Sequence, residues 1–129
     1  MPVPQRWKAY TWEDVAVVLY DLVKGASGSN VTQASLSSLT AKVFHGDTLT
    51  QVSTTITFVV ASTIFDTLQT VSDDPRYGGS GGYNFRGTIP GTYFPDPDQM
   101  YIVEVYFTDT SNNVYPDVWE IHARAVLGT

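Results

Sequence analysis

The sequence predicts an all-β protein built as an antiparallel β-sandwich of about seven strands, and the C-terminal quarter carries most of the evidence. Residues 99–109 and 114–127 alternate apolar and polar side chains and are joined by the turn residues Thr-Ser-Asn-Asn. Because neighbouring side chains of a strand point to opposite faces, this alternation buries one face of a hairpin and leaves the other in water. A sheet with one buried face needs a second layer, which favours a sandwich. The residues expected to face inward are Tyr101, Val103, Val105, Phe107, Tyr115, Trp119, Ile121, Ala123, Ala125 and Leu127.

The first half of the chain supplies three further predicted strands. Residues 14–23 are rich in β-branched and apolar residues, and a Gly/Ser/Asn-rich loop tip follows them. Residues 36–44 place Leu39, Ala41 and Val43 at alternate positions, and residues 49–60 do the same with Ile56 and Phe58. The pair Gly46-Asp47 marks the turn between these two strands.

The middle of the chain completes the predicted set. Residues 62–68 are compatible with a helical turn or a short strand, and the strand is favoured. Residues 72–82 form a loop by composition, and residues 83–89 resume the alternation with Phe85 and Ile89 on one side. Turn signals recur at intervals of roughly 8–12 residues, as expected of a sandwich, and no helix longer than two turns is predicted.

Length and composition exclude several classes of protein. A chain of 129 residues is expected to form one main domain, and without cysteine it has no disulfide, thiolate nucleophile or cysteine-bound zinc. A net charge of −6 is poorly suited to nucleic acid, whose binding depends on neutralising phosphates. We find no apolar run typical of a signal peptide or a membrane span, so we expect synthesis without an export signal and no membrane partner.

Residues 1–12 differ from the rest and are predicted to be an N-terminal arm, leaving residues 13–129 as the sandwich domain. Two prolines disfavour regular structure there. The arm carries Arg6, Trp7, Tyr10 and Trp12, residue types that are enriched at the centres of protein interfaces. Two interpretations stay open, because such a segment either packs on its own domain or docks on another chain.

No residues are arranged in a pattern typical of catalysis or cofactor binding. His45 and His122 have no partner at metal-ligand spacing, and we expect no catalytic residue, cofactor or metal. The strongest alternative is calcium, for which two loops offer oxygen ligands. Their carboxylates are Asp73, Asp74, Asp96 and Asp98.

Four short motifs give the chain a resemblance to a known group of proteins. They are the run 64–69, Gly82-Tyr-Asn-Phe85, Phe94-Pro95, and Tyr101-Ile-Val-Glu-Val-Tyr-Phe-Thr108. Their order resembles that in small immunoglobulin-like domains encoded among the structural genes of tailed phages, over residues 14–127. The resemblance implies an immunoglobulin-like sandwich that binds another virion protein, and it implies no catalytic residues.

The function expected from this resemblance is that of a capsid decoration or cement protein. Such a protein is made in the host cytoplasm, resides in the virion and binds the major capsid protein or another virion protein. A place in the neck or tail is a variant, and homo-oligomers are possible. The main alternative is a carbohydrate-binding module, because three Trp and eight Tyr could stack on sugar rings. An enzyme is the third and weakest reading.

Overall fold

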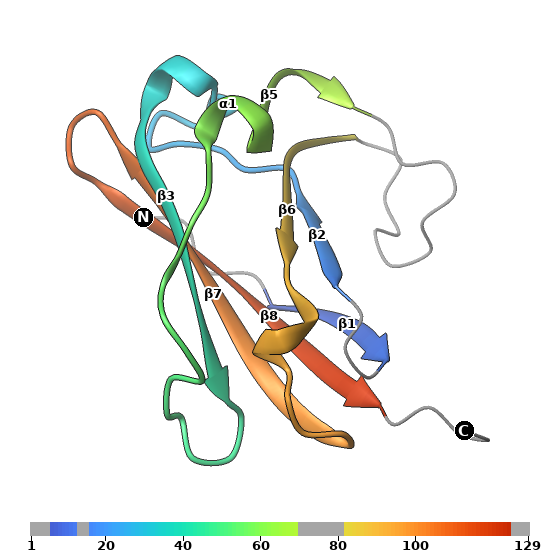
Figure 1. Ribbon diagram of the computed structural model, residues 1–129. Coiled ribbons are helices and arrows are strands. Elements are labelled where there is room, and N and C mark those ends of the chain that lie inside the picture. The colour runs from blue at the N-terminus through green and yellow to red at the C-terminus, as the bar shows by residue number, and fades with distance from the viewer. Residues whose placement is uncertain (1–5, 13–15, 70–81, 125–129) are drawn as a thin grey trace.

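The computed structural model describes residues 6–12, 16–69 and 82–124, which form two β-sheets packed face to face (Figure 1). The larger sheet has the strand order β1-β8-β7-β3-β4, and the smaller has the order β2-β6-β5. All strand pairs are antiparallel except β1–β8, which is parallel. The strands are β1 (Arg6–Trp12), β2 (Val17–Asp21), β3 (Leu36–His45), β4 (Ile56–Thr57), β5 (Ile64–Gln69), β6 (Tyr83–Ile89), β7 (Gln99–Asp109) and β8 (Val114–Arg124).

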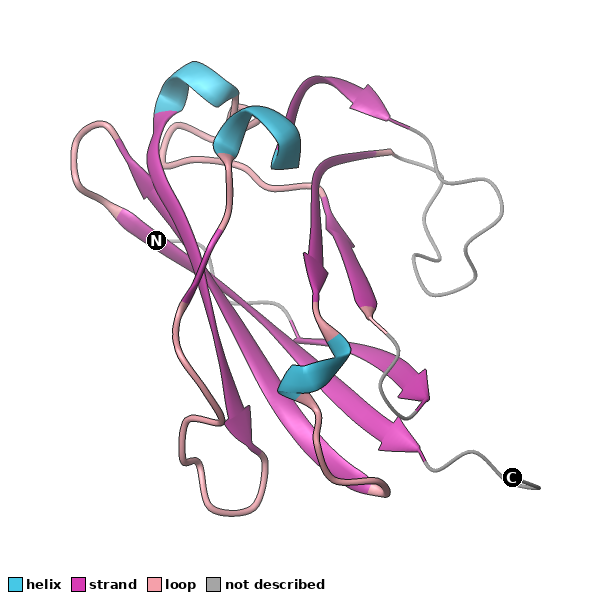
Figure 2. Ribbon diagram, in the orientation of Figure 1, coloured by secondary structure: helices cyan, strands magenta, loops and turns pink. Residues whose placement is uncertain are grey.

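This arrangement confirms the predicted all-β sandwich of two sheets. Helical structure in the described residues is limited to single turns at α1 (Val60–Thr63), Gln33–Ser35 and Gly91–Tyr93 (Figure 2). None of the helices in the described part of the chain is long and apolar enough to cross a bilayer.

The C-terminal hairpin has the predicted register as far as Ala123, whereas Ala125 and Leu127, also predicted to face inward, lie outside the described residues. Strands β7 and β8 pair from Gln99 opposite Ala123 to Thr108 opposite Val114. Burial alternates along β7, with the odd-numbered residues from Tyr101 to Phe107 fully buried. The four residues predicted at the centre of the core are buried as expected, namely Val103, Val105, Trp119 and Ile121.

An aromatic cluster joins the two sheets across the core. Phe85 of β6 lies 5.1 Å from Phe107 of β7 and 5.8 Å from Trp119 of β8, measured between ring centroids. The Phe85 ring also lies over Gly87 of its own strand, where an added Cβ would come within 2.7 Å of the ring. A side chain at position 87 would therefore push Phe85 out of its place between the sheets.

Two of the predicted elements differ from the structure. Residues 49–60 were expected to form one strand, but only Ile56–Thr57 pair regularly with β3. The rest of this segment follows β3 through isolated hydrogen bonds, such as those from Val52 N–H to the Val43 carbonyl (2.8 Å) and from Phe58 N–H to the Leu39 carbonyl (2.9 Å). Residues 62–68 contain both alternatives, because the helical turn α1 leads directly into β5.

The prediction of an irregular arm is wrong for residues 6–12, and the described part of the chain contains eight strands. These residues form β1, which pairs in parallel with β8 from Arg6 opposite Val118 to Trp12 opposite Arg124. Pro2 and Pro4 precede the paired residues and so remove no donor from this ladder. The segment is an edge strand, a position that the two prolines do not forbid.

The buried hairpin predicts a sharp response to a charge at Ile121, whose side chain is fully buried. Ile121→Asp should unfold the domain at neutral pH, because an unpaired buried carboxylate costs several kcal/mol out of a total stability of about 5–15 kcal/mol. Val114→Asp is the control, since Val114 lies on the same strand but is 41% exposed. Circular dichroism during thermal unfolding distinguishes them, and a native-like Ile121→Asp variant would contradict the assigned core.

Candidate functional site

The most unusual chemical feature of the described residues is a contact between a buried carboxyl group, that of Asp21, and a half-buried one, that of Asp117. Asp21 ends β2 in the inward register of Val17 and Leu19, and it is 4% exposed. Asp117 lies on β8 between the buried residues Tyr115 and Trp119 in the same register. The two carboxyls, one from each sheet, are hydrogen-bonded to each other.

The environment of the pair favours its protonated form. Burial raises the pKa of Asp21 to about 9, and the hydrogen bond to Asp117 and the charge of Asp117 act in the same direction. Burial also raises the pKa of Asp117. The Leu22 N–H donates to Asp21 Oδ1 over 2.8 Å and opposes the shift on Asp21. A hydrogen bond between two carboxyls requires a proton on one of them, so the pair shares a proton at neutral pH.

This pair can hold a proton, but its position does not suit catalysis. A general acid or base must come within hydrogen-bonding distance of a substrate. Asp21 is enclosed between the sheets, and among the described residues no amide, hydroxyl or amine donates to the buried Asp117 Oδ2. The pair therefore affects how strongly the two sheets are held together, and this effect depends on pH.

Asn84 of β6 is a buried polar side chain that cannot titrate and is satisfied by hydrogen bonds. It is fully buried, and its Oδ1 accepts from Val23 N–H over 2.7 Å. Its Nδ2 donates to the carbonyls of Val23 (2.9 Å) and Val31 (3.1 Å). Asn84 thus fixes both ends of the 23–31 loop to the smaller sheet.

The four residues proposed from the sequence to bind a partner lie together in β1. Arg6, Trp7, Tyr10 and Trp12 are opposite Val118, Trp119, His122 and Arg124 of β8, respectively. The structure therefore places them on the edge of the larger sheet rather than on a free arm.

The other candidate residues are dispersed. The His45 ring lies 5.3 Å from the Tyr101 ring, and His122 lies on β8 opposite Met100 of β7. Of the four loop carboxylates, Asp96 and Asp98 are exposed, while Asp73 and Asp74 lie outside the described residues. No group of three or more potential metal ligands occurs in residues 6–12, 16–69 and 82–124.

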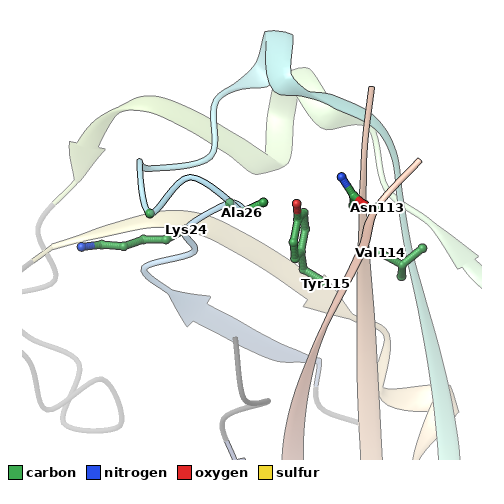
Figure 3. A pocket seen from close by; sticks show the side chains of 7 residues that line it. Lys24, Ala26, Asn113, Val114 and Tyr115 are labelled. Carbon is green, nitrogen blue, oxygen red and sulfur yellow. The ribbon is translucent and has the colours of Figure 1, made fainter. Parts of the chain in front are cut away.

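A hollow of about 530 Å³ opens between the 24–28 loop and the start of β8. Figure 3 shows the Tyr115 ring between Ala26 and Asn113, whereas the Lys24 side chain extends away from it. The Tyr115 hydroxyl donates to Asp109 Oδ2 over 2.8 Å, and this hydrogen bond raises the pKa of Tyr115. Tyr115 is therefore occupied in fixing the β7–β8 turn, and the hollow lacks the convergent polar groups of a specific small-molecule site.

The sequence contained a signal for the carboxyl pair that pattern reading missed. In an extended strand, Asp21 shares a face with Val17 and Leu19, and Asp117 shares a face with Tyr115 and Trp119. A carboxyl in an apolar register is unexpected in a core unless it has a partner. Two such residues in strands of different sheets predict a pair, but only the fold shows that they face each other.

Comparison with known proteins gives little further guidance. No protein-family model and no curated protein matches the sequence. Among solved structures, the chain is similar to the extracellular domain of the voltage-gated sodium channel β4 subunit, which is described as a parallel homodimer with a role in cell–cell adhesion. The TM-score is 0.40 at 10% sequence identity, over 98% of each chain. A likeness of this degree says nothing about what the present chain binds.

The carboxyl pair predicts that stability falls as pH rises. The folded chain keeps a proton on Asp21 up to about pH 9, whereas the unfolded chain releases it near the ordinary value of 3.8. The folded state therefore binds more protons between these values, and the free energy of unfolding falls across this window, by at most about 1.4 kcal/mol per pH unit for one group. Above the window the loss is complete.

Asp21→Asn should flatten this pH dependence, because the amide is uncharged and still donates to Asp117. At pH 8 we expect the variant to be more stable than the wild type by at least about 1 kcal/mol. Denaturant unfolding at pH 5 and pH 8 measures the effect, with Asp96→Asn as the exposed control. Parallel pH profiles for Asp21→Asn and the wild type would refute the shared proton.

Proposed function

We propose that this protein is a non-catalytic structural protein of a phage particle, attached to the major capsid protein as a decoration or cement protein. Attachment to a neck or tail protein is a variant of the same proposal. In either case the domain acts by burying surface against a virion partner. An interface of about 1,600 Å² is enough for stable attachment, and repeated copies add their effects across the particle.

The resemblance to phage immunoglobulin-like domains supports this proposal through residues that build the scaffold. The Gly82–Phe85 motif contains Asn84, which holds the 23–31 loop, and Phe85, which crosses the core. The Tyr101–Thr108 motif is the middle of β7, which is paired on both sides. These motifs therefore support the fold. The assignment to a virion rests on the phage proteins whose motifs this sequence resembles.

The observation that carries the proposal is the position of β1. It is the longest edge strand, with seven residues, and no described strand borders its outer side. An edge strand presents unpaired N–H and C=O groups, which can pair with an extended segment of another chain. The residue types at Arg6, Tyr10 and Trp12 are those that anchor interfaces, so the strand combines a backbone template with suitable side chains.

The carbohydrate-binding alternative has less support. A sugar platform needs aromatic rings at the surface, but several large rings are used inside the core. Those of Phe85, Phe107 and Trp119 form the contact between the sheets. No described observation favours sugar binding over protein binding.

The proposal predicts that the chain is found in purified particles and that β1 controls its attachment. Trp12→Ala should weaken binding to particles lacking the protein by about tenfold or more, the usual loss of an interface anchor. Single substitutions are preferable to removing residues 1–12, because removal would uncover β8. Thr11→Ala is the control on the same strand. Mass spectrometry tests presence, and occupancy against concentration tests attachment; full occupancy by Trp12→Ala would exclude β1 as the anchor.

A further inference from the structure

The turn that follows β3 holds an apolar residue in a backbone conformation that does not suit it. Leu49 has φ 59°, and its side chain is 65% exposed. The other non-glycine residues with positive φ in the described chain are Asp98 and Asn112. Asp and Asn tolerate the left-handed region because their short polar side chains bond locally, whereas leucine does not. The free protein thus bears a backbone cost at Leu49 and leaves most of an apolar side chain in water.

Hydrogen bonds fix Leu49 in this position. Leu49 N–H donates to the His45 carbonyl over 2.8 Å, and His45 N–H donates to the Thr50 carbonyl over 2.9 Å. The hydroxyls of Thr48 and Thr50 are 2.7 Å apart, and Thr48 N–H donates to Asp47 Oδ1 over 2.8 Å. The turn therefore presents the leucine in one orientation, which lowers the entropy lost when a partner binds it.

Met100 adds a second apolar side chain next to this turn. Gly46 N–H donates to the Met100 carbonyl over 2.9 Å, and a Cβ at Gly46 would lie 3.1 Å from Met100 Cε. Met100 is 38% exposed. We call Leu49 and Met100 the apolar tip. Strand pairing places Met100 opposite His122, which is opposite Tyr10, so the tip and the end of β1 lie at the same end of the larger sheet.

Carboxylates border the apolar tip. Asp47 lies two residues before Leu49 in the same turn, and Asp96 N–H donates over 2.9 Å to the hydroxyl of Tyr101, the residue that follows Met100; Asp47 and Asp96 are both exposed. With a net charge of −6 on the chain, these groups disfavour an anionic lipid surface or a second copy of this chain as the partner. They are complementary to a partner that carries lysine or arginine around its binding site.

We propose that the apolar tip docks into an apolar pocket bordered by basic residues on a protein partner. Insertion of Leu49 and Met100 would remove exposed apolar area from water, and Asp47 and Asp96 would pair with the basic border. The proposal extends the interface beyond β1, and it rests on the proposed function only for the identity of the partner as a virion protein.

The first test uses the free protein. Leu49→Asn suits a positive φ, so it should raise the thermal midpoint by about 3 °C. Val59→Thr is the matched control, because Val59 is 67% exposed but has an ordinary φ of −82°. A Leu49→Asn midpoint at or below that of the wild type would overturn the argument that Leu49 is kept at a cost.

The second test uses a synthetic host with the proposed chemistry, a β-cyclodextrin bearing amino groups on one rim, compared with neutral β-cyclodextrin. In methyl NMR spectra, the Leu49 and Met100 signals should shift at a several-fold lower concentration of the aminated host. The preference should disappear in the Asp47→Asn/Asp96→Asn variant. Equal responses to the two hosts would overturn the basic border, and Leu49-dependent binding to anionic phosphatidylserine vesicles would overturn the choice of a protein partner.

The third test uses particles that lack the protein and separates this inference from the proposed function. If the wild type attaches, Leu49→Asn should attach at least about tenfold more weakly, with Val59→Thr unchanged. Attachment of Leu49→Asn at the wild-type concentration would overturn the role of the tip and leave the proposed function standing. Failure of the wild type to attach would reject the proposed function, and the first two tests would still decide the tip.

Discussion

The two sheets depend on one aromatic contact that crosses the space between them. The ring of Phe85 meets both β7 and β8, through Phe107 and Trp119, and its centroid also lies 6.1 Å from that of Phe58, which follows β4. The contact requires Gly87, since any side chain there would occupy the space of the ring. Buried aromatic residues contribute large apolar areas and favour edge-to-face geometry, which fixes the distance and angle between the layers. The surrounding aliphatic residues then fill the remaining volume.

Buried polar groups modify this core in two different ways. Asn84 makes three hydrogen bonds to backbone groups, so its burial costs little and gives the 23–31 loop a fixed attachment. The Asp21–Asp117 pair satisfies itself only when one carboxyl is protonated, because two charged carboxylates in contact repel each other. The sandwich therefore contains one polar contact, that of Asn84, that is independent of pH, and another, the Asp21–Asp117 pair, that depends on pH.

Alternation in the sequence predicted the parts of the fold in which local pattern and tertiary environment agree. The β7–β8 hairpin is of this kind, because the apolar register of β7 is buried against the second sheet from Tyr101 to Phe107. The segment before α1 is not, because its apolar residues pack on the core while its backbone pairs with β3 only in places. Strand β1 was not predicted for two reasons. The prolines near the N-terminus disfavour regular structure, and nothing in residues 1–12 indicates a partner strand near the other end of the chain. Likewise, the apolar register of Asp21 and Asp117 indicates that each carboxyl needs a partner, but only the fold shows that their strands face each other. The strain at Leu49 is a property of the backbone alone.

The parallel pairing of β1 with β8 has a consequence for the order of assembly. One member of this pair is made early and the other is made late, so the early strand has no partner while most of the chain is being synthesised. Contacts between such distant segments slow folding, because the loop they close is long. During this interval the unpaired strand can equally well meet β8 of a neighbouring chain, and exchange of an identical element between chains is a common route to dimers. High local concentrations of newly made chains would therefore favour intertwined pairs, whereas dilute refolding would favour closed monomers.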